Sequence, residues 1–505
     1  SMLNRHGLIA GATGTGKTRT LQLVAEQLSA AGVPVVLADV KGDLSGIASP
    51  GTVSERIQQR AAQTGDEWQP TGYPVEFLAL GGLGTGVPVR ATLTDFGPLL
   101  LSKVLDLNDT QESSLGLIYH YADSAGLPLL DLQDLRAVVQ WLLSDEGKPE
   151  LKNLGGLSTA TAGVILRKLI SLAELGGDVF FGEPAFEPTD VLRTADDGRG
   201  VVSAIELAAV QDRPALFSTF LMWLLAELFE ELPEVGDLDK PKLVFFFDEA
   251  HLLFADASKA FLESVTQTVR LIRSKGVGIF FVTQTPTDVP SAGLGQLGNR
   301  VQHALRTFTP EDAKALRKTV STFPKTADYD LEELLTSLGI GEAAVTVLSD
   351  RGTPTPVAWT VLRAPRALMA PMDPAAMTQA VAASPLQATY GQPVDRESAY
   401  DRLTARMAPP PSAPQPAPAP DGYREPETYR EPEYREPQYP EPQYQEPEYR
   451  EPARRTRRPS GAAADDGVLG GVLGSAAFRS FTRSAASALG REITRGLFGT
   501  RRRRR

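Results

Sequence analysis

The sequence predicts an α/β fold with a mainly parallel sheet, and three observations carry this prediction. Apolar segments of strand length alternate with helical segments over residues 7–90 and again over residues 201–305. This alternation is typical of parallel sheets, whose strands are joined by helices. A glycine-rich octapeptide lies between the first strand and the first helix, and two later apolar strands end in polar residues. Such strand ends place polar groups along one edge of a sheet.

The elements can be assigned in chain order. We expect helices at 19–31, 53–64, 213–232 and 258–274, and strands at 7–10, 35–40, 75–80, 201–207, 243–247, 277–283 and 301–305. A final hairpin is expected from residues 343–348 and 355–362, on either side of an Asp-Arg-Gly turn. Between residues 94 and 175 apolar residues recur three and four positions apart, which predicts a helical insertion.

Composition divides the chain into six predicted segments. They are a first part of the core (1–93), the helical insertion (94–198), a second part of the core (199–370), a helical extension (371–407), a disordered Pro/Tyr/Glu-rich linker (408–466), and a basic amphipathic helix with an arginine tail (467–505). The linker repeats a Tyr-x-Glu-Pro unit six times, and prolines at this spacing exclude helices and central strands. It serves either as a spacer or as a tyrosine-bearing docking tract.

The C-terminal segment separates charge from apolar residues. In its predicted helix, arginines such as Arg483 lie on one side, while Phe481 and Leu489 lie on the other. Residues 454–505 carry 13 arginines against three carboxylates, a net charge of +10, so the rest of the chain carries −21. This helix could bind a protein partner, an anionic membrane surface or nucleic acid, or pack back on its own protein.

Composition also bounds the class of protein. The 505 residues contain no cysteine, which excludes disulfides, thiolate catalysis and cysteine-based zinc sites. No stretch of eighteen uninterrupted apolar residues predicts a membrane span, and no leader pattern precedes the first strand. We therefore expect a cytoplasmic location.

The octapeptide GATGTGKT matches the phosphate-binding pattern GxxxxGK[ST]. Its glycines allow positive φ and bring backbone N–H groups close to phosphate oxygens, while the next helix directs its positive end at the same anion. Lys17 is expected to reach the β- and γ-phosphates, and the Thr18 hydroxyl to bind Mg²⁺. The alternative is a glycine-rich turn that binds nothing. The expected nucleotide contacts are Gly11, Ala12, Thr13, Gly14, Thr15, Gly16, Lys17 and Thr18.

A second motif, KLVFFFDEA, is an apolar strand that ends in Asp248 and Glu249. Asp248 at the end of a buried strand can hold Mg²⁺, and the adjacent carboxylate of Glu249 can orient and deprotonate an attacking water. Asp248 could instead cap a helix. Together with the phosphate loop, the acidic pair predicts hydrolysis of a nucleoside triphosphate.

A third strand, at 277–283, is followed by Gln284. A neutral amide at this place can contact the γ-phosphate and the lytic water and report hydrolysis to the rest of the subunit. The alternative is a polar residue that opens the turn before Pro286.

Four segments, NRHGLIAGATGTGKT, ADVKGDLSG, FFFDEAHLLF and GVGIFFVTQTPTDVP, carry a family resemblance. Over residues 4–365 the chain resembles the HerA-like bacterial ATPases of the DUF853 (YjgR-type) family, within the HerA/FtsK group of hexameric translocases. The resemblance implies a RecA-like P-loop core, Mg²⁺-dependent ATP hydrolysis and a homo-oligomeric ring. It also implies that Asp39 lies near the nucleotide, and that an arginine from a neighbouring subunit completes the site, with Arg273 and Arg300 as the candidates.

Three functions remain open at this point. The first is an oligomeric ATPase that moves or remodels a polymer such as DNA. The second is a phosphotransferase that acts on a small molecule beneath a helical lid, and the third is a nucleotide-switched scaffold whose tail recruits partners. Glu249 next to Asp248 favours the first, because kinases of this type rarely carry that second carboxylate.

Overall fold

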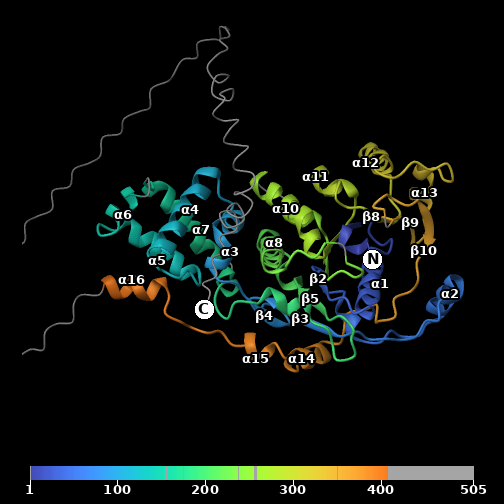
Figure 1. Cartoon of the computed structure of the whole chain (residues 1–505), viewed down its shortest axis with the longest axis horizontal. Helices are drawn as coiled ribbons and strands as arrows, with labels where there is room; N and C mark the ends of the chain where they lie inside the picture. Colours follow the sequence, from blue (N-terminus) through green and yellow to red (C-terminus); the bar gives the residue numbers. More distant parts are fainter. Residues whose placement is uncertain are drawn as a thin grey trace, which may run out of the picture. The chain divides into compact units, whose positions relative to one another are not determined.

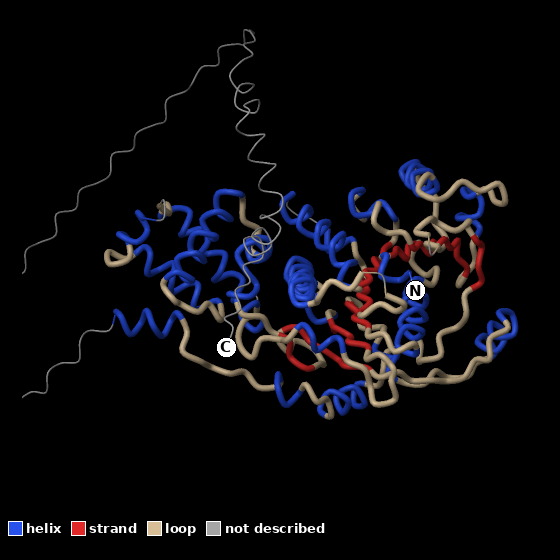
Figure 2. The backbone as a smooth tube through the Cα atoms, viewed as in Figure 1, coloured by secondary structure: helices blue, strands red, loops and turns tan. Residues whose placement is uncertain are grey.

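The computed structural model describes residues 2–153, 156–174, 176–236, 238–254, 259–349 and 351–407. Within these ranges one sheet has the strand order β10-β9-β8-β1-β7-β6-β2-β5-β3-β4 (Figures 1 and 2). The strands are β1 (Gly7–Ala10), β2 (Val35–Asp39), β3 (Val75–Leu80), β4 (Val87–Val89), β5 (Val202–Glu206), β6 (Leu243–Phe247), β7 (Val277–Thr283), β8 (Asn299–Gln302), β9 (Glu342–Thr346) and β10 (Ala358–Val361). The linker and basic helix predicted from the sequence lie outside the described residues.

The sheet is parallel from β8 to β4, and only β9 runs against its neighbours β8 and β10. The carboxyl ends of β1, β7, β6, β2 and β5 therefore meet at one edge of the sheet. This arrangement, with a phosphate loop after β1, is a RecA-like P-loop fold and confirms the predicted α/β class. The predicted C-terminal hairpin is also correct and corresponds to β9 and β10.

Helices connect the strands and cover both faces of the sheet (Figure 2). The α-helices are α1 (Lys17–Ala30), α2 (Glu55–Thr64), α3 (Leu93–Val104), α4 (Asp109–Ser124), α5 (Leu132–Leu143), α6 (Lys148–Asn153), α7 (Thr159–Glu174), α8 (Pro214–Glu231), α9 (His251–Phe254), α10 (Lys259–Ile272), α11 (Ser291–Leu294), α12 (Pro310–Val320), α13 (Leu331–Ser337), α14 (Pro374–Ala382), α15 (Gln387–Tyr390) and α16 (Ala399–Met407). Short 3₁₀ turns are η1 (Met2–Arg5), η2 (Ser45–Ala48), η3 (Gly177–Phe180), η4 (Pro188–Leu192), η5 (Ala208–Val210), η6 (Arg273–Lys275) and η7 (Pro286–Asp288). No described helix has the length and apolar character that a membrane span requires.

The strand sequences explain why the sheet is buried on both faces. Because side chains alternate along a strand, Phe245 and Phe247 of β6 join the core that contains α8, whereas Phe246 joins the core that contains Leu21 of α1. Phe247 in turn stacks on Phe281 of β7, with ring centroids 5.5 Å apart. Continuous apolar strands of this kind are typical of the centre of a parallel sheet.

The extension after residue 370 runs from the core to the helical insertion (Figure 1). Near its middle, the Tyr390 hydroxyl donates to Asp190 at 2.6 Å, and the guanidinium of Arg396 pairs with Glu183. At its end, α16 packs on α5 of the insertion. The extension therefore ties the insertion to the sheet.

Two strand assignments from the sequence differ from the structure. The short strand β4 was not expected, because its three residues contain a proline. The strand expected at 301–305 ends earlier, at Gln302. Beyond it two backbone hydrogen bonds still join this segment to the end of β1 and the phosphate loop: the N–H of His303 donates to the carbonyl of Ala10 at 2.7 Å, and that of Ala12 to the carbonyl of Ala304 at 2.8 Å.

Candidate functional site

The phosphate loop joins β1 to α1 and depends on its glycines. Gly11, Gly14 and Gly16 have φ values of 155°, 79° and 112°, which disfavour other residues. At Gly11 the space is also closed, because a Cβ atom there would lie 2.5 Å from Cβ of His303. The backbone thus curls in front of the N-terminus of α1, where N–H groups and the helix dipole favour an anion.

Lys17 places its ammonium inside this loop. Its Nζ atom donates to the carbonyl oxygens of Gly11 at 2.7 Å and Ala12 at 3.2 Å. Burial lowers the pKa of Lys17, although the carboxylates of Glu249 and Asp248 act in the opposite direction. Thr18 follows in the first turn of α1 and is half-buried. A phosphate in the loop would therefore meet a desolvated cation and a hydroxyl at the same end of the helix.

The acidic pair lies two strands away from the loop, because β7 separates β1 from β6. At the usual strand spacing this is a gap of about 10 Å. The pair is fixed by the N–H of Ala250, which donates to the carbonyl of Val282 in β7 at 2.9 Å. A terminal phosphate and a water molecule fit within that gap, between the loop and the carboxylates.

Asp248 is buried at the end of β6 with an unused ligand atom. Its Oδ2 atom has no hydrogen-bond partner among the described residues. Burial, together with the charge of Glu249, raises the pKa of Asp248 to about 7. A cation close to Asp248 would favour the ionised form of its carboxyl group, so this position suits a metal ion.

Glu249 turns the chain sharply after the strand. Its φ of 48° is in the left-handed region, which is uncommon for a residue with a side chain and is frequent at functional sites. Its side chain is about 10% exposed and accepts a hydrogen bond on Oε1 from Nζ of Lys41. Its Oε2 atom lies 3.4 Å from Nδ1 of His251. The carboxylate is thus desolvated and held by the loop that follows β2.

Asp39 ends β2, the strand that pairs with β6 and its acidic pair. Its carboxylate accepts hydrogen bonds from the N–H groups of Lys41, Gly42 and Leu44, at 3.2, 2.8 and 2.8 Å. These bonds use both oxygens to shape the loop after β2. A position of Asp39 near the nucleotide stays a prediction. The loop carries Lys41 to Glu249, a contact that sequence reasoning missed. Its only sequence signal was the position of Lys41 directly after a strand.

Gln284 follows β7, between the phosphate loop and the acidic pair, and is exposed. The preceding residue, Thr283, is buried and donates to Oδ2 of Asp288 at 2.5 Å, which fixes the end of the strand. An exposed amide at this edge is compatible with a contact to a terminal phosphate. The sensor role of Gln284 stays a prediction.

Arg300 points into its own subunit. Its guanidinium donates to the carbonyl of Thr322 at 2.8 Å and its Nε to that of Leu297 at 3.2 Å, and it lies over the ring of Phe323. Burial lowers its pKa. These carbonyls engage part of its five N–H donors within the same chain. A role of Arg300 in the site of a neighbouring subunit stays a prediction.

Arg273 lies in η6, before the N-terminal end of β7, and its side chain is exposed. The phosphate loop lies at the opposite edge, about 20 Å away across a seven-residue strand. Within one subunit Arg273 therefore does not reach the site. A role in the site of a neighbour stays a prediction.

His303 packs against the phosphate loop and the start of α1. This role was not predicted from the sequence. Its ring is fully buried, and its Nε2 atom lies 2.8 Å from the Thr20 hydroxyl of α1. Burial lowers the pKa of His303 to about 4, so the ring is neutral at pH 7. On the other side, the N–H of Gly341 donates to the carbonyl of Thr15 at 3.3 Å. The loop is thus held by segments about 300 residues away in the chain.

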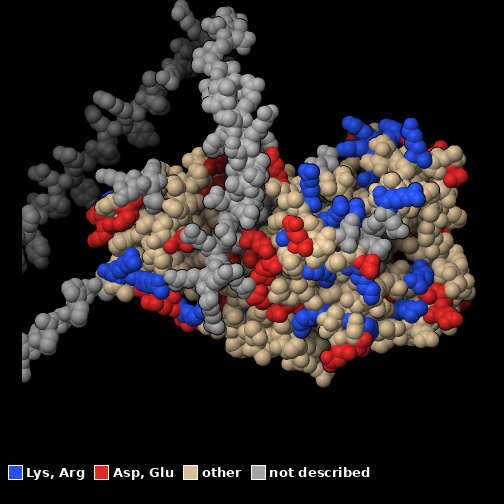
Figure 3. All heavy atoms as spheres, in the orientation of Figure 1, with Lys and Arg blue, Asp and Glu red and all other residues tan. Residues whose placement is uncertain are grey.

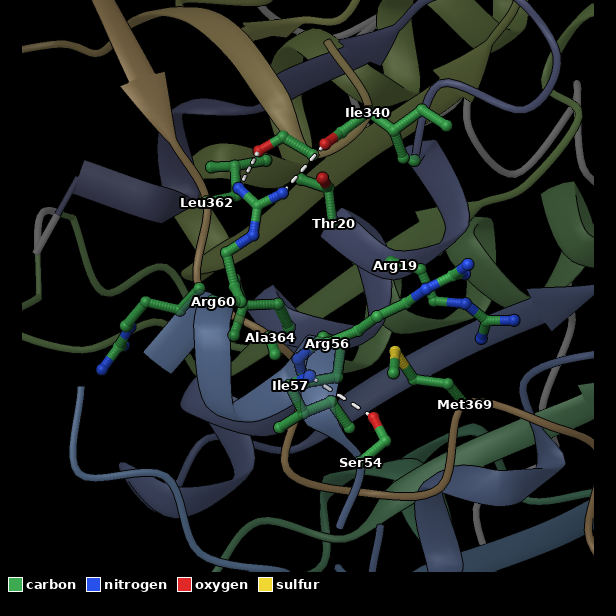
Figure 4. Close-up of a pocket in the computed structure, with 15 residues that line it drawn as sticks. Arg19, Thr20, Ser54, Arg56, Ile57, Arg60, Ile340, Leu362, Ala364 and Met369 are labelled. Atoms are coloured by element: carbon green, nitrogen blue, oxygen red, sulfur yellow. Dashed lines mark hydrogen bonds between the residues drawn. The ribbon is translucent and has the colours of Figure 1, made fainter. Parts of the chain in front are cut away.

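A cavity of about 310 Å³ opens beside the N-terminus of α1 (Figure 4). Arg60 crosses it and donates to the carbonyls of Ile340 at 3.0 Å and Gly341 at 3.4 Å. The walls combine cationic and apolar side chains: Arg19, Arg56, Arg60 and Arg363 with Leu23, Ile57, Ile340, Leu362, Pro365 and Met369. Such a lining suits a flat apolar ring attached to an anionic chain.

A buried carboxyl group next to the site gives a pH-dependent prediction. Glu206 ends β5 directly opposite Asp39, and burial together with that charge raises its pKa to about 8. The unfolded chain ionises Glu206 near pH 4.5, whereas the folded chain keeps the proton until about pH 8. The contribution of Glu206 to the free energy of unfolding is therefore fully present below its pKa in the unfolded chain. It is lost as the pH rises through its pKa in the folded chain. The Glu206→Gln variant is expected to lack this loss, on the order of a few kcal/mol.

Urea unfolding of both proteins at pH 5.5 and pH 8.5 measures this difference. Wild type should lose more stability than the variant between the two pH values. Equal losses in both proteins would contradict the assignment of a raised pKa to Glu206.

The family model for the helicase HerA-like C-terminal region matches residues 1–505. The chain belongs to this family. It is accordingly a P-loop nucleoside-triphosphate hydrolase of the HerA type, as the resemblance implied. The narrower DUF853 assignment stays a prediction.

The solved structures that the chain matches have low sequence identity to it. The plasmid coupling protein TrwB with a non-hydrolysable ATP analogue is 16% identical, with a TM-score of 0.48 over 74% of this chain and 88% of that chain. VirB4 of Thermoanaerobacter pseudethanolicus is 16% identical, with a TM-score of 0.46 over 71% and 89%. The genome packaging NTPase B204 from Sulfolobus turreted icosahedral virus 2 is 9% identical, with a TM-score of 0.30 over 70% and 97%. A search of curated proteins gives no match.

Proposed function

We propose that the chain is a Mg²⁺-dependent ATPase that works as a homo-oligomeric motor on a polymer, with DNA as the favoured substrate. The observation that carries this proposal is the buried Asp248–Glu249 pair, two strands from Lys17 in the phosphate loop. One carboxylate can hold a metal while the other accepts a proton from water. A protein that only binds nucleotide does not need the second carboxylate.

Mg²⁺ fits the donors that this edge offers. The Thr18 hydroxyl and the unpartnered Oδ2 atom of Asp248 would hold it, with phosphate oxygens as further ligands. Among the described residues there is no group of three or more His, Asp or Glu side chains that forms a metal cage. Such a cage is unnecessary for an ion that arrives with the nucleotide phosphates. When bound, Mg²⁺ would neutralise charge on the phosphates.

The phosphate loop and the neighbouring cavity together could bind the phosphates, the ribose and the base of ATP. Phosphates would contact the loop N–H groups and Lys17, while the base and ribose would enter the cavity beside Arg60 (Figure 4). Glu249 would then orient and deprotonate the water that attacks the γ-phosphate. Gln284 would contact the same phosphate from the end of β7.

Exposed apolar side chains next to the cavity support a homo-oligomer, for which we propose a hexameric ring. Ile340 lines the cavity and is 71% exposed, and Val53 and Trp359 lie close in sequence to other lining residues and are half exposed or more. Apolar residues gathered on a surface mark interaction sites. A subunit docked here would bring a second chain to the nucleotide, where Arg273 of the neighbour could stabilise charge.

Basic residues over α12 support nucleic acid as the substrate (Figure 3). Lys314, Arg317 and Lys318 are exposed on this helix, and Phe308, just before it, is 87% exposed. Cationic and aromatic side chains together suit a phosphate backbone and its bases. A protein or membrane-surface partner for the C-terminal basic helix, and a cytoplasmic location, remain predictions.

One set of measurements tests this function. We expect Mg²⁺-dependent ATP hydrolysis that DNA stimulates several-fold, and rings in negative-stain images with a slowly hydrolysed ATP analogue. The triple variant Lys314→Ala, Arg317→Ala, Lys318→Ala should keep its hydrolysis without DNA but bind DNA more weakly, with a shallower salt dependence. Stimulation of the triple variant equal to that of wild type would remove α12 from the DNA site. A monomer without ATPase activity would reject the motor.

A further inference from the structure

The contact between Lys41 and Glu249 is not explained by phosphate binding or by hydrolysis alone. We propose that Lys41 is a positioning residue that exchanges partners: it holds Glu249 until a γ-phosphate takes its place and releases the carboxylate for catalysis. This inference rests on the proposed ATPase function, because it concerns the same site. It assigns to Lys41 the recognition of the terminal phosphate, and so the preference for a nucleoside triphosphate over a diphosphate.

The fold brings the two residues together by strand pairing. Strands β2 and β6 are parallel neighbours, with Ala38 opposite Phe247, and Lys41 and Glu249 each lie two residues beyond the end of their strand. The Asp39 carboxylate fixes the loop in between by accepting hydrogen bonds from the Lys41 and Gly42 N–H groups. The position of Lys41 is thus built into the loop and does not depend on Glu249.

Lys41 also lies within electrostatic range of the phosphate loop. Burial alone would lower the pKa of Lys41, but the hydrogen bond from Lys41 to Glu249 and the charges of Glu249 and Asp248 raise it. The charge of Lys41 in turn lowers the pKa of Lys17. The two ammonium groups are therefore close enough to influence each other, and the charges of Glu249 and Asp248 act on both. A terminal phosphate bound between the loop and the acidic pair would interact with both ammonium groups.

The two partners differ in their freedom to move. The side chain of Lys41 is 47% exposed, whereas that of Glu249 is 10% exposed. Lysine has a long flexible stem, so its ammonium can turn to a phosphate while the buried glutamate stays in place. A terminal phosphate carries more negative charge than one carboxylate, which favours the exchange.

The exchange would couple recognition to chemistry. The Lys41 ammonium engages Oε1 of Glu249 and holds the carboxylate in one orientation, so only Oε2 is open to a water molecule. With ADP no γ-phosphate competes, so Glu249 would stay paired. With ATP the carboxylate becomes free to turn only after the terminal phosphate has reached Lys41. Hydrolysis would then start only in a correctly filled site.

Four proteins test the exchange: wild type, Glu249→Gln, Lys41→Met and the double variant. Affinities are measured for the β,γ-imido analogue of ATP and for ADP, both with Mg²⁺. In the wild-type background, Glu249→Gln removes two effects that weaken analogue binding: the competition of Glu249 for Lys41 and the repulsion between Glu249 and the phosphate. In the Lys41→Met background there is no Lys41 to compete for, so Glu249→Gln removes only the repulsion. Glu249→Gln should therefore tighten analogue binding about 3- to 10-fold more in the presence of Lys41 than in its absence. ADP binding should change little in every protein.

A static ion pair predicts the opposite order. If Lys41 stayed on Glu249 in the ATP state, it would screen the carboxylate, and Glu249→Gln would tighten binding more in the Lys41→Met background. That order, or an equal gain with ADP, would overturn the proposal. Lys41→Arg keeps the charge and should keep the wild-type order, which guards against a folding defect in Lys41→Met. Lys168→Met, at an exposed ion pair with Asp106, is the matched control and should leave both affinities unchanged.

The same proteins separate this inference from the proposed function. Loss of hydrolysis in Glu249→Gln without the predicted order of affinities would reject the exchange and leave the ATPase mechanism standing. Full hydrolysis in Glu249→Gln would reject the mechanism and the exchange with it.

Discussion

Glu249→Gln is expected to lower the maximal rate of ATP hydrolysis by about 10²- to 10⁴-fold, the range that a positioned general base contributes. The amide keeps the shape of the carboxylate but does not accept a proton from water. Nucleotide binding should persist, because the phosphate loop and the cavity lie two strands away. Single-turnover hydrolysis together with equilibrium binding of ATP measures both quantities.

The environment of Glu249 explains why this effect should be large. The residue is buried, it has a left-handed backbone with φ of 48°, and it directly follows the metal candidate Asp248. No other carboxylate adjoins Asp248 in the chain, and the nearby Asp39 already accepts three backbone hydrogen bonds. Glu249 is therefore the carboxylate best placed beside Asp248 to act as the base.

Glu206→Gln is the matched control for this experiment. Glu206 is also a buried glutamate at the end of a central strand, but burial raises its pKa to about 8, so it is largely protonated at pH 7. Replacing a neutral carboxyl group by an amide should leave hydrolysis near the wild-type rate. If both variants lost activity equally, the loss would come from damage to the edge of the sheet and not from a missing base.

The local parts of this fold could be predicted from the sequence because they depend on neighbouring residues. Short sequence segments are enough to predict the alternating strands and helices, the glycine-rich loop and the hairpin at β9 and β10. The order of the strands in the sheet could not be predicted from short segments. The insertion of β7 between β1 and β6 follows from packing of the whole sheet, and this order sets the distance between the loop and Glu249.

The site residues divide in the same way. Lys17 could be predicted from the glycine-rich loop that precedes α1, and Asp248 and Glu249 from the apolar strand that they follow. Lys41 could not be paired with Glu249 from the sequence, since 208 positions separate them and the contact requires β2 beside β6. Arg300 was a candidate through its position in the family resemblance, and only the three-dimensional structure shows that its guanidinium donates to the carbonyls of Leu297 and Thr322.

Lys17→Met is expected to remove the stabilisation that ATP gives to the protein. Wild type at 100 times its dissociation constant should gain about 2.7 kcal/mol, seen as a rise in melting temperature of a few degrees. The variant loses the ammonium that faces the phosphates, so the same ATP concentration should produce almost no rise. Thermal unfolding with and without Mg²⁺ and ATP makes this measurement.

Without nucleotide, Lys17→Met should change stability by only about 1 kcal/mol, because two effects oppose each other. The substitution leaves the carbonyls of Gly11 and Ala12 without the Lys17 donor, which costs stability. It also removes a charge whose burial lowers the pKa of Lys17 and is itself unfavourable. Lys168→Met, on the surface of α7, should keep the full response to ATP. If Lys17→Met also kept that response, the phosphates would have to bind elsewhere, and the loop from Gly11 to Thr18 would be the glycine-rich turn that binds nothing.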